Sequence, residues 1–189
     1  MDLVTVVDGR IRRGARNREA IIDALIACYN EGTLLPSVQQ VAERAGLSAR
    51  SVHNHFVDVE ALRGAVAQRQ WDRFSRLAVP IDMTSPIDER VVQLVDQRAA
   101  IFEGVTPVRR AALLWLASSP TIAASLARVD RTLRRQIDRA FPGVPPDVAD
   151  AIDALASWDT WNRLRAAQGL SVARARRVLT NAIRTLLDI

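Results

Sequence analysis

Apolar residues recur at spacings of three and four along almost the whole chain, and no segment shows a convincing β-strand pattern. One face of the first such segment carries Ile21, Ile22, Leu25, Ile26 and Tyr29. About half of the 189 residues are apolar and a quarter are charged, a balance that allows a core to be buried. The pattern therefore predicts an all-α protein.

Helix-starting and helix-ending residues divide the chain into about nine expected helices. The first ends at Gly32, and the next three begin after Ser37, Ser48 and Asp58. The fourth is long and reaches Leu77, and the segment from Pro80 to Pro86 then breaks the pattern.

Further helices are expected beyond this break. One should run from Ile87 to Phe102, and both Thr106-Pro107 and Ser119-Pro120 should open another, because proline suits the first helical position. Residues 141–146 predict a loop. The last two helices are expected over 147–168 and 171–187, with Gly169 between them.

Features of the sequence also indicate where the protein works. Cys28 is the only cysteine, so a disulfide within the chain is impossible and a reducing compartment is expected. The N-terminal sequence starts acidic and lacks the apolar run of a signal peptide. The uncharged stretch 111–127 is shorter than the roughly 20 apolar residues of a membrane span. These features predict a cytoplasmic protein.

The net charge is +5, and every basic residue except the two histidines is arginine. A genomic bias toward arginine codons explains most of this, and an anionic partner is the functional alternative. Because a net charge of +5 is modest, the distribution of charge matters more than its sum. The segment "RIRRGARNR" holds Arg10, Arg12, Arg13, Arg16 and Arg18 without any acid. Such an arm could contact phosphates or the minor groove of DNA, or could be a solvated tail.

The stretch "VQQVAERAGLSARSVHNHF", residues 38–56, has the pattern of two short helices joined by a tight turn. Ala42 must be small where the next helix crosses, and Gly46 suits a left-handed turn. Leu47 is expected to enter the core from the turn, and Ser48 to cap the second helix. Val52 should point back toward Ala42, which completes the pattern of a helix-turn-helix.

The outward side of the second short helix should carry groups that bond to bases or phosphates. Arginine can pair with guanine and asparagine with adenine in the major groove, which admits one helix. The alternative is that any two helices joined by "AGLS" produce this pattern. The predicted DNA-binding residues are Arg16, Arg18, Ser37, Ser48, Arg50, Ser51, His53, Asn54 and His55.

Residues 17–66 resemble the DNA-binding region of the TetR family of bacterial transcription regulators. The resemblance lies in the glycine after the first helix, in "SVQQVAERAGLS", in the pair His55-Phe56 and in "EAL" at 60–62. Two positions depart from the family: His53 replaces a tyrosine that commonly touches the DNA backbone, and Val59 replaces a lysine. His53 can still donate a hydrogen bond, whereas Val59 cannot, and the arginines of the arm could compensate.

The resemblance implies three parts: a flexible basic arm (residues 1–14), a helix-turn-helix domain (15–62) and a helical effector-binding and dimerisation domain (63–189). It also implies a ligand-responsive repressor that binds a palindromic DNA operator as a homodimer and is released by a small-molecule effector. In such a two-state mechanism the effector would favour a dimer with badly spaced recognition helices. No cofactor, metal or membrane partner is implied.

The helix expected over 147–168 carries apolar residues over an arc too wide for a helix covered on one side only, and the last helix carries an apolar stripe. Two-fold pairing would cover both sides and would give two recognition helices the spacing of one DNA turn. The alternative is a larger monomeric core. The predicted dimer interface consists of Trp161, Leu164, Val172, Leu179, Ile183 and Leu186.

An apolar effector pocket is a further expectation, with core packing as the alternative role of the same residues. Its predicted lining is Trp71, Phe74, Phe102, Leu114, Trp115 and Trp158.

An enzyme is not expected, because the sequence offers no evident set of acid, base and nucleophile. His53 and His55 lie two residues apart and would point away from each other on a helix, so they cannot hold a metal together. Cys28 is expected to be a buried structural thiol. The remaining alternative is a helical protein-interaction module that does not bind a specific DNA sequence, in which the polar residues of 49–54 would be solvated surface.

Overall fold

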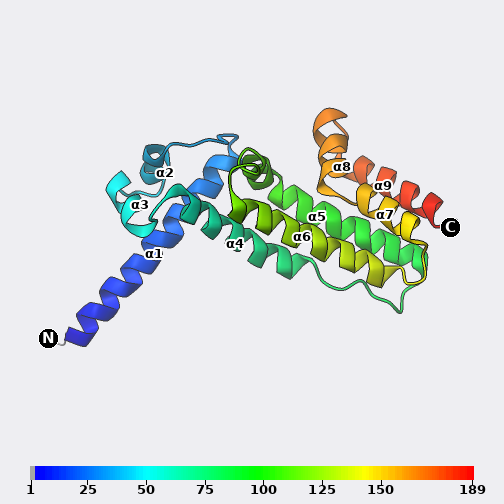
Figure 1. Ribbon diagram of the computed structural model, residues 1–189, viewed down its shortest axis with the longest axis horizontal. Coiled ribbons are helices and arrows are strands. Elements are labelled where there is room, and N and C mark those ends of the chain that lie inside the picture. Colours follow the sequence, from blue (N-terminus) through cyan, green and yellow to red (C-terminus); the bar gives the residue numbers. More distant parts are fainter. Residues whose placement is uncertain (1–2) are drawn as a thin grey trace. The chain divides into compact units, whose positions relative to one another are not determined.

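The computed structural model describes the backbone of residues 3–189 and the side chains from Ile11 onward (Figure 1). Its elements are α1 (Leu3–Asn30), α2 (Val38–Arg44), α3 (Ala49–His55), α4 (Val59–Leu77), α5 (Ile87–Leu113), α6 (Pro120–Ala140), α7 (Pro146–Leu155), α8 (Trp158–Asn162), the π-helical turn η1 (Arg163–Ala167) and α9 (Val172–Leu186). Residues 3–189 contain no strand, so the all-α prediction is confirmed.

The chain divides into two compact units. Unit 1 combines the residues up to Gln70 with 107–124, and unit 2 combines 71–106 with 125–189. The functional boundary predicted after residue 62 is a separate division of the chain and stays a prediction. The segment 107–124 falls within the predicted second domain (63–189) but belongs to the same compact unit as α1 to α3.

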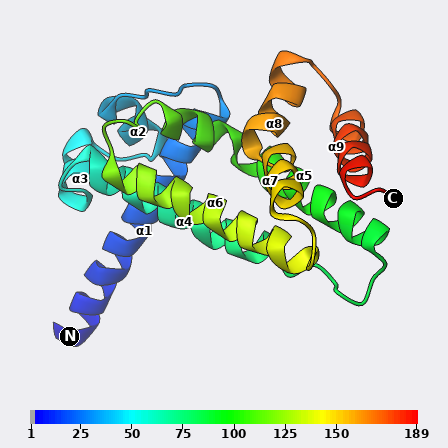
Figure 2. The same cartoon turned by 45° about the vertical axis from the view of Figure 1, so that its right-hand side comes forward.

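Unit 1 is built around α1, with α2 and α3 beside its C-terminal half (Figure 2). Buried side chains of all three helices form its core together with residues of α4 and α5. Burial of this apolar surface is the main stabilising contribution. The core residues include Ile21, Ile22, Leu25, Val41, Ala42, Val52, Phe56, Leu62, Val66, Val108 and Ala111.

Unit 2 has a larger core, to which α4, α5, α6, α7, α8, η1 and α9 all contribute. The N-terminal part of α5 is buried on several sides, with Val91, Leu94 and Val95 fully enclosed. Arg98 on the same helix is also fully buried, which is unusual for a charged side chain. Burial lowers the pKa of its guanidinium to about 10, although the nearby charge of Asp153 opposes that shift.

The first helix begins earlier than the sequence predicted. The segment 1–14 was expected to be a flexible arm, but α1 is helical from Leu3 onward. Met1, Asp2 and the side chain of Arg10 lie outside the described residues. Gly14 is accommodated within the helix, where no turn of the chain requires it.

The structure also corrects two predicted helix boundaries. The helix α5 continues from Ile87 through Pro107, where a new helix was expected. Gly104 does not end it: Arg73 lies 2.6 Å from the place a Cβ would occupy, so glycine there permits a close side-chain approach.

The helix expected over residues 147–168 is broken instead at Ser157. This residue is extended (φ −80°, ψ 159°), and its side chain accepts a hydrogen bond from the Thr160 amide (3.2 Å) as the N-cap of α8. None of the described helices is long and apolar enough to cross a membrane.

Candidate nucleic-acid interface

The turn between α2 and α3 has the geometry that the sequence predicted. Gly46 adopts a left-handed conformation (φ +66°), and Ala42 is fully buried where the two helices cross. The amide of Leu47 donates to the carbonyl of Ala42 (2.9 Å), which closes the turn. Ser48 then caps α3 by accepting a hydrogen bond from the amide of Ser51 (3.2 Å). The helix-turn-helix geometry is therefore present.

The start of α2 is fixed by a capping box. The side chain of Ser37 accepts from the amide of Gln40 (3.2 Å), and the side chain of Gln40 accepts from the amide of Ser37 (2.8 Å). This arrangement satisfies two amides that the helix itself leaves without partners. Ser37 and Ser48 both stabilise helix starts, whatever further contacts their hydroxyls make.

The side of α3 that faces away from the core is polar. Arg50, His53 and Asn54 are exposed, while Ser51 and His55 are half-buried. The hydroxyls of Ser48 and Ser51 lie 2.9 Å apart and can share a hydrogen bond. The structure thus brings five of the predicted residues onto one short helix, three of them with side chains free to reach outward.

The other predicted contacts lie on α1. Arg16 and Arg18 are exposed, and the guanidinium of Arg18 lies 4.9 Å from the centre of the Phe56 ring. This cation–π contact links α1 to the end of α3. Position 14 of α1 also lies near α3, because a Cβ added to Gly14 would be 4.0 Å from Cε1 of His55.

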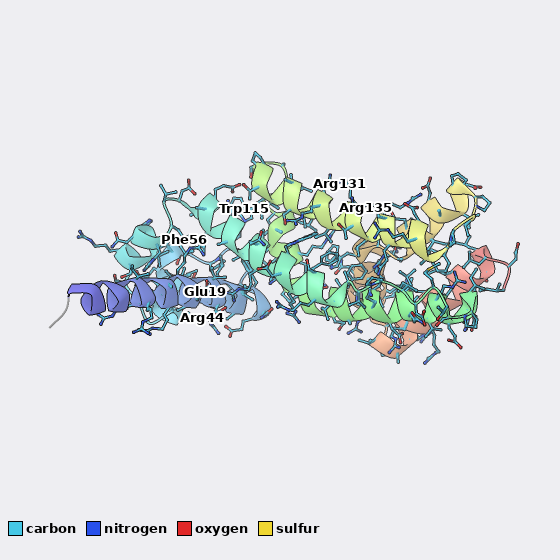
Figure 3. All side chains as sticks on the ribbon, turned by 90° about the horizontal axis from the view of Figure 1, so that it is seen from below. Glu19, Arg44, Phe56, Trp115, Arg131 and Arg135 are labelled. Atoms are coloured by element: carbon cyan, nitrogen blue, oxygen red, sulfur yellow. The ribbon has the colours of Figure 1, made fainter. Side chains whose placement is uncertain are left out.

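Acidic residues of α1 and of the position just after it pair with arginines of α4 and α2. Glu19 and Asp23 both pair with Arg69 of α4, and Glu31 pairs with Arg44 of α2. Figure 3 labels Glu19, Arg44 and Phe56. Exposed ion pairs such as these add little stability. They do offset the carboxylates of α1 and so favour the approach of an anion to the arginines of α1 and α3.

Sequence reasoning missed a set of contacts that fixes the segment between α5 and α6 onto α4. The hydroxyl of Ser119 donates to Glu60 (2.5 Å), and this hydrogen bond is the main reason why the pKa of Glu60 is lowered. The guanidinium of Arg63 lies 3.6 Å from the centre of the Trp115 ring. Only the three-dimensional fold brings these pairs together, since their members are far apart in the sequence.

The predicted pocket residues are divided between the two units. Leu114 and Trp115 belong to unit 1, where Leu114 is exposed and Trp115 is covered by Arg63. In unit 2, Phe74, Phe102 and Trp158 are buried core residues, and half-buried Trp71 packs beside Phe74 with ring centres 5.3 Å apart. These residues of unit 2 belong to its core or pack against it, and their role in an effector pocket stays a prediction.

The residues of the predicted dimer interface differ in how far unit 2 itself covers them. Trp161, Leu164, Leu179 and Ile183 are buried within the core of unit 2 itself. Val172 and Leu186 are half-buried against that core. A side chain that is already enclosed by its own chain has no surface left for a partner. These four side chains therefore contribute to the core of their own chain, and the pairing of two chains stays a prediction.

The fold is shared with known transcription regulators. The chain superposes on a TetR-family transcriptional regulator from Streptomyces coelicolor with a TM-score of 0.72 and 19% identity, covering 90% of this chain and 82% of that one. A transcriptional regulator from Rhodococcus gives 0.71 and 18%, covering 93% and 96%. The TetR-like regulator LfrR from Mycobacterium smegmatis, in complex with proflavine, gives 0.60 and 21%, covering 89% and 94%.

By sequence, the chain matches no family profile and no curated protein. The structural likeness at this level of identity establishes the fold. The class that it defines is the all-helical TetR-like fold, and the helix-turn-helix described above occupies its N-terminal region.

Proposed function

We propose that this chain is a DNA-binding transcription regulator of the TetR type and has no enzymatic activity. The observation that carries the proposal is the turn at Gly46 with the polar face of α3 beyond it. A buried small residue and a left-handed glycine fix the angle between α2 and α3. Arg50 and Asn54 then lie on an exposed surface, where such side chains can pair with base edges.

The residues of α1 and α3 have different roles in this proposal. Arg50 and Asn54 contact base edges. His53 donates a hydrogen bond to the DNA backbone in place of the tyrosine common in the family. Arg16 binds phosphate and carries no sequence information. Because Val59 cannot contact phosphate by charge, the arginines of α1 supply the electrostatic part of the affinity.

Regulation follows the two-state scheme of a cytoplasmic repressor. A homodimer would present two copies of α3 to a near-palindromic operator, and an effector would lower the affinity for DNA by its preference for the other state. The bound proflavine of LfrR supports a small-molecule effector as the regulatory signal. The dimer would use exposed residues together with half-buried Val172 and Leu186, since the other four side chains first expected at the interface are enclosed in unit 2.

The proposal is tested by selecting fragments of the host genome that the protein retains, followed by fluorescence anisotropy with a selected and a scrambled duplex. The Arg50→Ala variant should bind the selected duplex about 5- to 100-fold more weakly and lose preference for it. The Arg16→Ala variant should weaken binding to both duplexes equally and lower the salt slope by about one.

The matched control is Arg131→Ala, which removes the same charge from an exposed position on α6 in unit 2. It should leave both affinities unchanged. Weak binding without any preferred sequence, or no binding at low salt, would instead support a protein-interaction module. Sedimentation of the free protein tests the homodimer independently of DNA.

A further inference from the structure

A groove in unit 2 runs beside the C-terminal half of α6. It is lined on one side by the segment that follows α4 and on the other by α6, and has a volume of about 420 Å³. Pockets for small organic ligands start at roughly 300 Å³. Its lining combines apolar Ala78, Pro80, Ile81, Met83 and Ala140 with polar Thr132, Arg135, Gln136 and Arg139.

The two arginines of the groove are available to a ligand. Arg135 and Arg139 are exposed, lie four residues apart on α6, and have no ion-pair partner among residues 11–189. The neighbouring Arg134 differs, because it pairs with Asp138 and Asp150. Arg135 also donates to the hydroxyl of Thr132 (3.3 Å), which helps to hold its guanidinium beside the groove. Figure 3 labels Arg135 and, one turn before it, Arg131.

Hydrogen bonds hold the two sides of the groove together. The side-chain amide of Gln136 donates to the carbonyl of Val79 (2.7 Å) and to the side-chain oxygen of Gln97 (2.7 Å). The side-chain amide of Gln97 also donates to the carbonyl of Val79 (2.8 Å). The segment after α4 is thereby tied to both α5 and α6. A groove held in this way needs little reorganisation to accept a ligand.

A buried positive charge lies directly behind the groove. The guanidinium of Arg98 donates to the side-chain oxygen of Gln136 (2.6 Å) and to the carbonyl of Leu133 (3.1 Å), while its Nε has no partner. Asp153 is the acid whose charge acts on Arg98. Because Gln136 lines the groove, the cation behind it adds to the attraction that Arg135 and Arg139 exert on an anion.

We infer that this groove binds an amphipathic carboxylate, such as a medium-chain fatty acid. The alkyl chain would cover the exposed Pro80 and Met83, beside Ile81 and Ala140 that the protein already buries, and the carboxylate would accept hydrogen bonds from Arg135 and Arg139. A neutral ligand would leave both guanidinium groups without a counter-charge, and a small inorganic anion would leave Pro80 and Met83 in contact with water. That this ligand is also the effector of DNA binding rests on the proposed function, whereas its binding to the groove does not.

Calorimetric titration of the full chain without DNA tests the inference, with octanoate as the probe and octanol and butyrate as comparisons. Octanoate should bind about tenfold or more tightly than either, since octanol lacks the charge and butyrate most of the chain. The Arg135→Gln and Arg139→Gln variants should each weaken octanoate about tenfold. The matched control, Arg131→Gln, lies on the same helix outside the groove and should change nothing.

Equal affinities for octanoate and octanol, or an equal loss in the Arg131→Gln variant, would overturn the inference. So would an absence of octanoate binding, or sedimentation showing that Arg139→Gln disrupts a dimer whose second copy fills the groove. Addition of octanoate to the protein–DNA complex tests whether the ligand lowers DNA affinity, separately from whether it binds the groove. Binding by calorimetry with no DNA affinity at all would retain the ligand site and reject the regulator.

Discussion

Replacement of Gly46 by alanine should destabilise the protein solely through the backbone. The residue has φ +66°, and apart from its two chain neighbours no residue places an atom within 4 Å of the position that a Cβ would take, so no clash with the rest of the protein contributes. The left-handed conformation costs a residue with a Cβ about 1 to 2 kcal/mol relative to glycine. The free energy of unfolding of Gly46→Ala should fall by that amount, measured by urea denaturation with circular dichroism detection.

The same substitution at Gly14 should act in the opposite direction. Gly14 lies within α1, where alanine is favoured over glycine by about 1 kcal/mol, and its added Cβ would make only an ordinary contact with His55 at 4.0 Å. The two variants should thus differ by about 2 to 3 kcal/mol. Asparagine at position 46 should recover part of the loss, because it tolerates the left-handed region. Equal stability of Gly46→Ala and the natural protein would refute the reasoning.

Three further substitutions test contacts described above. Hydrogen bonds from Arg165 and Trp161 lower the pKa of Glu103 below its ordinary value of 4.5. Its carboxylate therefore stabilises the fold at a pH above 4.5, and this contribution is lost as the pH falls through the lowered pKa. In Glu103→Gln, the free energy of unfolding from urea titrations across pH 3 to 6 should fall less at acid pH. Arg98→Met should lower the free energy of unfolding by about 2 kcal/mol, because buried acceptors lose their donor. Ser48→Ala should cost about 1 kcal/mol in thermal denaturation through loss of the α3 cap.

The helix-turn-helix was predictable because its determinants are local. Ser37, Gly46 and Ser48 impose caps and a turn within a few residues of themselves, and the structure has each of them in the expected conformation. The exposure of Arg50 follows from the same pattern, since Val52 must face the core. The role of these side chains toward DNA remains a prediction.

Features decided by distant contacts were not predictable in this way. The local sequence predicts a helix start at Pro107, yet Val108 and Ala111 beyond it are buried in unit 1 and the helix continues. The wide apolar arc around Trp161 indicated burial on two sides, but periodicity alone could not show whether its own chain or a second copy supplied the cover. The groove beside α6 depends on Gln136 reaching Val79, a contact between residues far apart in sequence.

The π-helical turn η1 has a consequence for how this chain can change in length. In it the amide of Gln168 bonds to the carbonyl of Arg163 (3.0 Å), one residue further back than in an α-helix. Loss of a single codon here would convert the turn to ordinary α-helical bonding and would leave the series of backbone hydrogen bonds unbroken. The same loss inside α6 or α9 would rotate every later side chain by about 100° relative to its neighbours. One-residue length differences between related genes are therefore expected at η1 before either of those helices.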